Sequence, residues 1–207
     1  MAFFDTAVNL DPTAANQIAN LAPKLLKIYK FISMESNSDY AINGAQDPFL
    51  QVSILGLMKS LKKINESREF NNYFLELVIA VNDVMSGSSL GTPKNGPKAI
   101  LYECFQCAVL LDASPKLKRI VDDMLTKFIS TKDANSKYLS LVNLGLMSKY
   151  EISIAKNYKG VIIECLSEND ILIQTMALDL LYIIAAQDNA STIIKELLNI
   201  LLSATDE

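Results

Sequence analysis

Apolar residues recur every three or four positions along almost the whole chain, and this spacing limits the fold more than any other feature of the sequence. It is the period of one helix face. The sequence therefore predicts about nine helices, which cover residues 18–32, 50–64, 70–84, 100–111, 117–128, 133–148, 154–165, 173–184 and 194–201. No segment shows the polar–apolar alternation of a half-buried strand between turn residues. We therefore expect an all-α fold.

Two of these helices follow an aspartate that can cap them. Asp47 precedes Pro48, and Asp170 precedes the apolar run that begins at Ile171. An aspartate at this position accepts a hydrogen bond from a free backbone N–H, and proline suits the first helical turn. The sequence predicts that Asp47 and Asp170 start their helices.

An internal repeat has a period of 37 residues. The segment that begins at Asp133 aligns with the segment that begins at Asp170, and each follows one apolar helix and starts another. Helix pairs at this period are typical of HEAT or armadillo solenoids. We therefore predict a HEAT/armadillo-like α-solenoid that forms one helical-repeat domain over residues 1–207. A compact helical bundle is the alternative, because its helices have the same apolar spacing.

Composition excludes several classes of function. The net charge is −4, and 17 of the 19 basic residues are lysine, whereas base readout and phosphate clamping rely on arginine. We expect no nucleic-acid partner.

The chain has no histidine, which removes the commonest general base and metal ligand. The apolar runs are too short to cross a bilayer, and the first residues do not read as a secretory signal. Three cysteines then suggest a reducing, cytoplasmic setting.

Five motifs give the chain a family resemblance. They are residues 47–58 (DPFLQVSILGLM), 99–103 (AILYE), 163–170 (IECLSEND), 176–181 (MALDLL) and 194–198 (IKELL). In this order and with similar gaps, they resemble the trunk of the large adaptins of clathrin adaptor complexes, and residues 48–52 favour the gamma type. The resemblance covers about residues 18–202.

The resemblance implies a function and partners. It implies a helical-repeat segment of a longer adaptin trunk that acts in vesicle-mediated intracellular protein transport. The implied partners are a sigma-type small chain, a beta-type large chain, a medium chain and an Arf-type GTPase. The implied location is cytoplasmic and peripheral, on trans-Golgi and endosomal membranes and coated vesicles. An unrelated solenoid scaffold, such as a transport receptor or regulatory subunit, is the alternative.

Three segments could suggest chemistry, and each has a structural explanation. Cys104 and Cys107 form a C-x-x-C pair, but they share the apolar face of their helix, so we expect buried thiols. Asp122 and Asp123 are adjacent on a helix and diverge. The Gly-rich segment 87–96 lacks the spacing of a phosphate-binding loop. We predict no catalytic, cofactor-binding or metal-binding residue, and no enzyme activity.

One surface feature is a candidate contact. Lys59, Lys62 and Lys63 cluster at the end of their predicted helix. Such a cluster can bind an acidic partner or an anionic membrane. Cations are also favoured at a helix C-terminus without any partner. The sequence leaves both explanations open.

Overall fold

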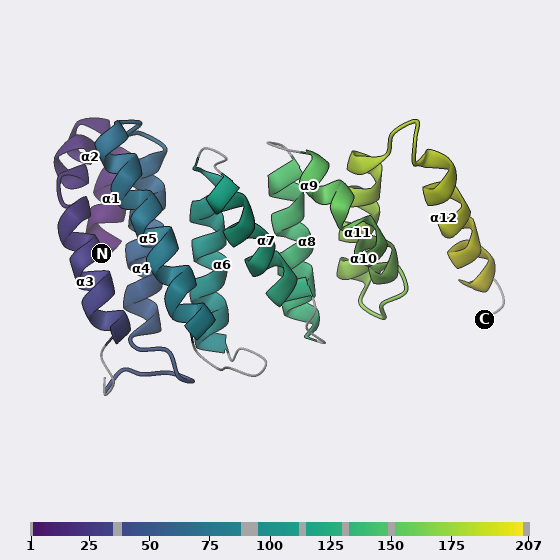
Figure 1. The fold of residues 1–207 in the computed structure, drawn as a ribbon, viewed down its shortest axis with the longest axis horizontal. Coiled ribbons are helices and arrows are strands. Elements are labelled where there is room, and N and C mark those ends of the chain that lie inside the picture. Colours follow the sequence, from purple (N-terminus) through teal and green to yellow (C-terminus); the bar gives the residue numbers. More distant parts are fainter. Residues whose placement is uncertain are drawn as a thin grey trace. The chain divides into compact units, whose positions relative to one another are not determined.

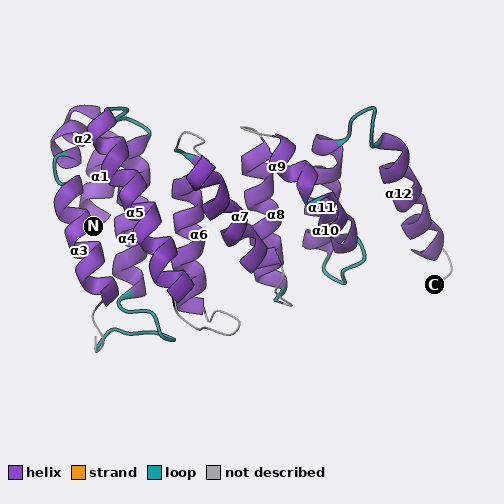
Figure 2. Ribbon diagram, viewed as in Figure 1, coloured by secondary structure: helices purple, strands orange, loops and turns teal. Residues whose placement is uncertain are grey.

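The computed structural model describes residues 2–34, 39–87, 95–111, 115–129, 133–148 and 152–204, and every regular element within them is a helix (Figure 2). These residues form twelve helices: α1 (Ala2–Leu10), α2 (Pro12–Ala19), α3 (Ala22–Met34), α4 (Pro48–Lys62), α5 (Arg68–Gly87), α6 (Asn95–Val109), α7 (Pro115–Ile129), α8 (Ala134–Ser148), α9 (Ile152–Asn157), α10 (Lys159–Cys165), α11 (Ile171–Ile184) and α12 (Ala190–Ala204). The predicted all-α class is confirmed.

The predicted number of about nine helices is wrong for three local reasons. The first predicted helix is divided into α2 and α3, because Pro23 has no N–H with which to continue the helix from Ala19. The seventh is divided into α9 and α10 at Tyr158, whose backbone leaves the helical conformation with ψ 11°. The short helix α1 was not predicted at all.

Contacts between residues divide the chain into two units, Met1–Met124 and Leu125–Glu207. Helix α7 (Pro115–Ile129) runs across the boundary between them. The prediction of one helical-repeat domain over residues 1–207 stays a prediction.

In the first unit, α4 is the central helix. It packs against α1, α3 and α6, while α5 packs against α3 and α6 (Figure 1). Its fully buried side chains are Ile54, Leu55, Leu57, Met58 and Leu61. The neighbours contribute Tyr29 from α3, Phe74 and Leu77 from α5, and Phe105 from α6. Neighbouring helices thus bury one another's apolar faces, as stacked helix pairs do.

In the second unit, α11 is the central helix and contacts α8, α9 and α10. The 37-residue repeat is visible in its burial. The buried residues of α11 are Ile173, Ala177, Leu180, Leu181 and Ile184. The residues 37 positions earlier are Ser136, Ser140, Asn143, Leu144 and Met147, and all of them are buried in α8. Equivalent repeat positions are therefore buried in α8 and in α11. Three of these positions in α8 hold polar residues, which explains why the apolar periodicity of α8 is weak.

Asp170 and Asp47, the two aspartates predicted to cap helices, differ in their hydrogen bonds. Asp170 caps α11, since its carboxylate accepts a hydrogen bond from the backbone N–H of Leu172 at 2.8 Å. The predicted capping by Asp47 is wrong. Its backbone is left-handed (φ 39°), and its side chain makes no capping hydrogen bond to α4. Instead, the backbone carbonyl of Asp47 accepts from the N–H of Gln51 at 3.0 Å.

The loop before α4 contains a tight turn that the sequence analysis did not predict. Ile42 and Ala45 exchange two backbone hydrogen bonds of 2.9 and 3.0 Å. Asn43 and Gly44 between them have φ values of 54° and 87°, the conformation for which an Asn-Gly pair is suited. The carbonyl oxygen of Ile42 faces Gly96 in the first turn of α6, where a Cβ atom would lie only 2.8 Å from it. Gly96 therefore lets the turn pack directly on α6.

Gly96→Ala should destabilise the chain by about 1–3 kcal/mol, because the new methyl group would overlap a backbone oxygen that cannot rotate away. The free energy of unfolding in urea measures this loss. Gly56→Ala is the matched control, since a Cβ there lies at an ordinary 3.7 Å from the nearest atom of a neighbouring helix. That control should be neutral or stabilising by about 0.5–1 kcal/mol. Equal effects at both positions would contradict the close approach.

Asp170→Ala should lower the free energy of unfolding by about 1 kcal/mol, because the N–H of Leu172 loses its acceptor. Asp170→Asn is the control, since the asparagine oxygen can accept the same bond. We expect Asp170→Asn to stay within about 0.5 kcal/mol of the parent chain. A loss of the same size in both variants would show that the negative charge matters and not the cap.

Candidate interaction surfaces

The three lysines of the predicted contact lie where α4 ends, but they do not share one environment. Lys59 forms an ion pair with Glu103 of α6, and both side chains are largely buried. Lys62 is half-buried in the last turn of α4, and Lys63 is the exposed residue that follows it. Lys59 therefore ties α4 to α6, and a contact of Lys62 and Lys63 with a partner stays a prediction.

The two cysteines of the C-x-x-C pair are buried, as predicted, and their role is structural. Cys104 and Cys107 lie one turn apart on α6, and both are fully buried free thiols. Cys104 Sγ donates to the carbonyl of Val78 in α5 at 3.7 Å, and Cys107 Sγ donates to that of Leu55 in α4 at 3.5 Å. Burial raises the pKa of both thiols well above the ordinary value. They remain protonated at neutral pH and are unsuited to nucleophilic chemistry.

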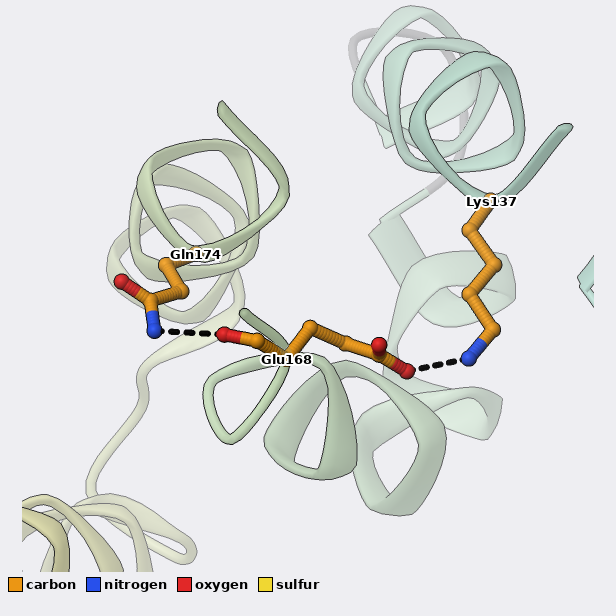
Figure 3. A network of polar contacts seen from close by, with 3 residues as sticks. All are labelled: Lys137, Glu168 and Gln174. Atoms are coloured by element: carbon orange, nitrogen blue, oxygen red, sulfur yellow. Dashed lines mark hydrogen bonds and ion pairs between the residues drawn. The ribbon is translucent and has the colours of Figure 1, made fainter. Parts of the chain in front are cut away.

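The acidic segment before α11 also has a structural role (Figure 3). The carboxylate of Glu168 pairs with Lys137 of α8, and its backbone carbonyl accepts from Gln174 Nε2 of α11 at 2.6 Å. The hydrogen bond that Lys137 donates to the Glu168 carboxylate raises the pKa of Lys137. Glu168 thereby joins α8 to α11 at the turn between α10 and α11. Because Glu168 is paired with Lys137 and Asp170 caps α11, these two residues do not form a free pair of carboxylates.

The remaining sequence candidates do not converge. Asp122 and Asp123 are both exposed on α7. Most of the Gly-rich segment, residues 88–94, lies outside the described residues. Among the residues that are described, no three histidine, cysteine or acidic side chains are placed to hold a metal ion. Over the same residues, no helix is both long and apolar enough to cross a bilayer.

An apolar groove in the second unit was not predicted. It runs between α11 and α12 as two hollows of about 530 and 440 Å³ that share Leu178, Ile194 and Leu197. Ile194, Leu198 and Leu201 belong to the apolar stripe of the helix predicted over residues 194–201, but each is more than half exposed. Helical periodicity identified the apolar stripe of α12 correctly, although it gave no information on what covers that stripe.

A second set of exposed apolar side chains lies on α3 and α4. Phe31 and Met34 lie in the last turns of α3, and Phe49 lies in the first turn of α4. All three side chains are at least 70% exposed. Exposed large apolar side chains are candidates for contacts with other proteins.

The raised pKa values of the two thiols predict how stability changes with pH. In the unfolded chain a thiol ionises near pH 8.5, whereas in the folded chain both stay protonated. The folded state therefore binds more protons above pH 8.5, and stability falls as pH rises. The loss reaches at most about 1.4 kcal/mol per thiol for each further pH unit.

Urea unfolding at pH 8 and pH 10 measures this loss. A variant with Cys104→Ala and Cys107→Ala should be less stable at pH 8 but should lose less stability on going to pH 10. Both thiols should also resist alkylation at pH 8 until the chain is unfolded. Equal losses of stability in the two proteins would contradict the assigned pKa shifts.

Comparison with known proteins identifies the family. The family described as "Adaptin N terminal region" matches residues 6–207. The chain is 31% identical over 94% of its length to the AP-1 complex subunit gamma of Dictyostelium discoideum. It is 26% identical over 100% of its length to the AP-1 complex subunit gamma-1 of Schizosaccharomyces pombe, and 30% identical over 88% to the AP-2 complex subunit alpha-1 of Arabidopsis thaliana.

The chain spans about a fifth of these relatives, with 21% of the Dictyostelium protein, 23% of the yeast protein and 18% of the plant protein covered. The predicted resemblance to gamma-type large adaptins and the HEAT/armadillo-like solenoid class are confirmed. The chain belongs to the adaptin family, in whose N-terminal region nearly all of its residues lie.

Proposed function

We propose that the chain is a scaffold segment of a clathrin-adaptor large subunit of the gamma type. It acts in vesicle-mediated intracellular protein transport by binding other adaptor subunits. The observation that carries this proposal is the family match over residues 6–207, together with relatives named as subunits of the AP-1 complex. The unrelated solenoid scaffold considered from the sequence does not account for that match.

The partners in this proposal are a sigma-type small chain, a beta-type large chain and a medium chain, with an Arf-type GTPase as recruiter. The location is then cytoplasmic and peripheral, on trans-Golgi and endosomal membranes, through the assembled complex. The exposed side chains of Phe31, Met34 and Phe49 favour this function, because apolar and aromatic anchors supply most of the affinity of protein interfaces.

The mechanism involves no covalent chemistry. The thiols of Cys104 and Cys107 are held protonated and buried, and the carboxylate of Glu168 is engaged by Lys137. What the chain offers instead is a set of rigid helices whose outer faces present side chains at fixed spacing. Lys62 and Lys63 contribute a positive edge at the end of α4 that would meet acidic residues of a partner.

Co-purification with a sigma-type and a beta-type chain tests this proposal. We expect the 207-residue chain to co-elute with at least one of them at micromolar concentration. A double variant, Lys62→Glu with Lys63→Glu, should slow association by about tenfold at low salt and lose this effect at high salt, because rim charges act mainly on the on-rate. Lys27→Glu with Lys195→Glu makes the same change in net charge elsewhere and should have little effect.

Two results would contradict the proposal. Failure of every adaptor chain to bind at about 100 µM would remove the scaffold function, since specific interfaces are tighter than this. Equal slowing by the two double variants would leave the scaffold function intact but would exclude Lys62 and Lys63 as the contact.

A further inference from the structure

We propose that Asn43 is a site of spontaneous deamidation, and that the isoaspartyl product breaks the contact between its turn and α6. Asn43 and Gly44 form the tip of the tight turn in the loop between α3 and α4. The modification is covalent, needs no enzyme and no reactant other than water, and is independent of the scaffold function.

The reaction joins two neighbouring groups of the chain. The backbone nitrogen of Gly44 loses its proton and attacks Cγ of Asn43, which closes a five-membered succinimide ring. The bond from Cγ to Nδ2 breaks, and the side-chain nitrogen leaves as ammonia. Water then opens the ring. Attack of water at Cγ gives aspartate, whereas attack at the backbone carbonyl carbon of Asn43 leaves the Gly44 nitrogen on Cγ and gives isoaspartate.

The turn leaves both reacting groups accessible. Asn43 and Gly44 are exposed, and the two hydrogen bonds that close the turn belong to the backbone groups of Ile42 and Ala45. Within the described part of the chain, neither the carboxamide of Asn43 nor the N–H of Gly44 has a hydrogen-bond partner. Glycine has no side chain to obstruct the approach of its nitrogen to Cγ. No bond therefore has to be broken at either reacting group before the ring closes.

Other asparagines of the chain hold their carboxamides in place. Asn65 Oδ1 accepts from the N–H of Ser67 at 2.9 Å, and Asn71 Nδ2 donates to the carbonyl of Glu66 at 3.3 Å. Asn189 is buried and bonded through both ends of its carboxamide, to the N–H of Ala186 and the carbonyl of Ile184. None of these three residues precedes a glycine. Asn43 differs from them in both respects.

The second Asn-Gly pair of the chain, Asn95 and Gly96, provides an internal comparison. Both residues lie in the first turn of α6, and Gly96 is buried. A Cβ atom on Gly96 would lie 2.8 Å from the carbonyl oxygen of Ile42, so the backbone at Gly96 is tightly packed. Ring closure at Asn95 would move the nitrogen of Gly96 out of its helical position and out of this contact. We expect Asn95 to react at least about tenfold more slowly than Asn43, because local opening must come first.

Isoaspartate at position 43 cannot preserve the turn. It adds one methylene group to the main chain between Ile42 and Ala45, whose mutual hydrogen bonds of 2.9 and 3.0 Å require a loop of two ordinary residues. Ala45 is buried, and its Cβ lies 3.6 Å from the Cβ position of Gly96. A longer turn would therefore draw Ile42 and Ala45 away from α6. Aspartate keeps the length of the main chain and tolerates a positive φ, so the aspartyl product should retain the contact.

Peptide mapping of the incubated 207-residue chain tests the modification. The chain is held at pH 8, digested at acidic pH to prevent further reaction, and analysed by mass spectrometry with fragmentation that distinguishes isoaspartate from aspartate. We expect both products at Asn43, formed at least about tenfold faster than any product at Asn95. The reaction should be slower at pH 6, because the nitrogen of Gly44 must lose its proton before it attacks.

Urea unfolding of the separated products tests the structural consequence. The isoaspartyl form should unfold at a lower urea concentration than the parent chain. Asn43→Asp is the control, since it introduces the same charge without the extra methylene group and should unfold close to the parent chain.

Three outcomes would overturn the proposal. The first is an intact Asn43 after an incubation in which a free peptide of residues 41–46 reacts completely, and the second is an equal rate at Asn43 and Asn95. The third is an isoaspartyl form that unfolds at the same urea concentration as Asn43→Asp, because the turn would then not depend on its length.

Discussion

The structure depends on the burial of one helix by several neighbours. In each unit a central helix is covered by several others: α4 by helices that precede and follow it, and α11 by α8, α9 and α10, which all precede it. The interior is mostly aliphatic and aromatic, and burial of such side chains gives about 25 cal/mol for each Å² removed from water. A helix in this arrangement is stable only where a neighbour is present. The same constraint accounts for the exposed apolar groove, since no helix in the described part of the chain packs extensively on α12.

Sequence periodicity predicted the presence of most helices because burial of one face imposes the spacing directly. It failed at local interruptions. Pro23 ends the helix before α3 by removing a hydrogen-bond donor, and that signal was available in the sequence. The break at Tyr158 has no comparable signal, apart from the low helix propensity of the nearby Gly160. Periodicity also failed at Ile194 and Leu201, because it detects an apolar face without specifying which surface packs on it.

The polar contacts were harder to predict because they join residues that are distant in sequence. The two thiols on α6 were expected to be buried, but their bonds to Val78 and Leu55 depend on how α5 and α4 pack around them. Lys59 was grouped with Lys62 and Lys63 by proximity in sequence. Its ion pair with Glu103 depends on the packing of α4 against α6, which the sequence alone does not specify. A helix-end cluster of lysines therefore contains both a structural residue and surface residues, and the ion pair with Glu103 distinguishes Lys59 from the other two.

Comparison of the repeats separates residues that stabilise the fold from residues that can bind. Leu141 and Leu178 have the same identity and the same place in the repeat, so their intrinsic preferences are equal. They differ only in whether a helix covers them. In a repeat protein, an uncovered position thus retains the packing chemistry of its covered counterpart. The exposed apolar residues of α11 and α12 therefore carry the same pattern that stacks the buried repeats.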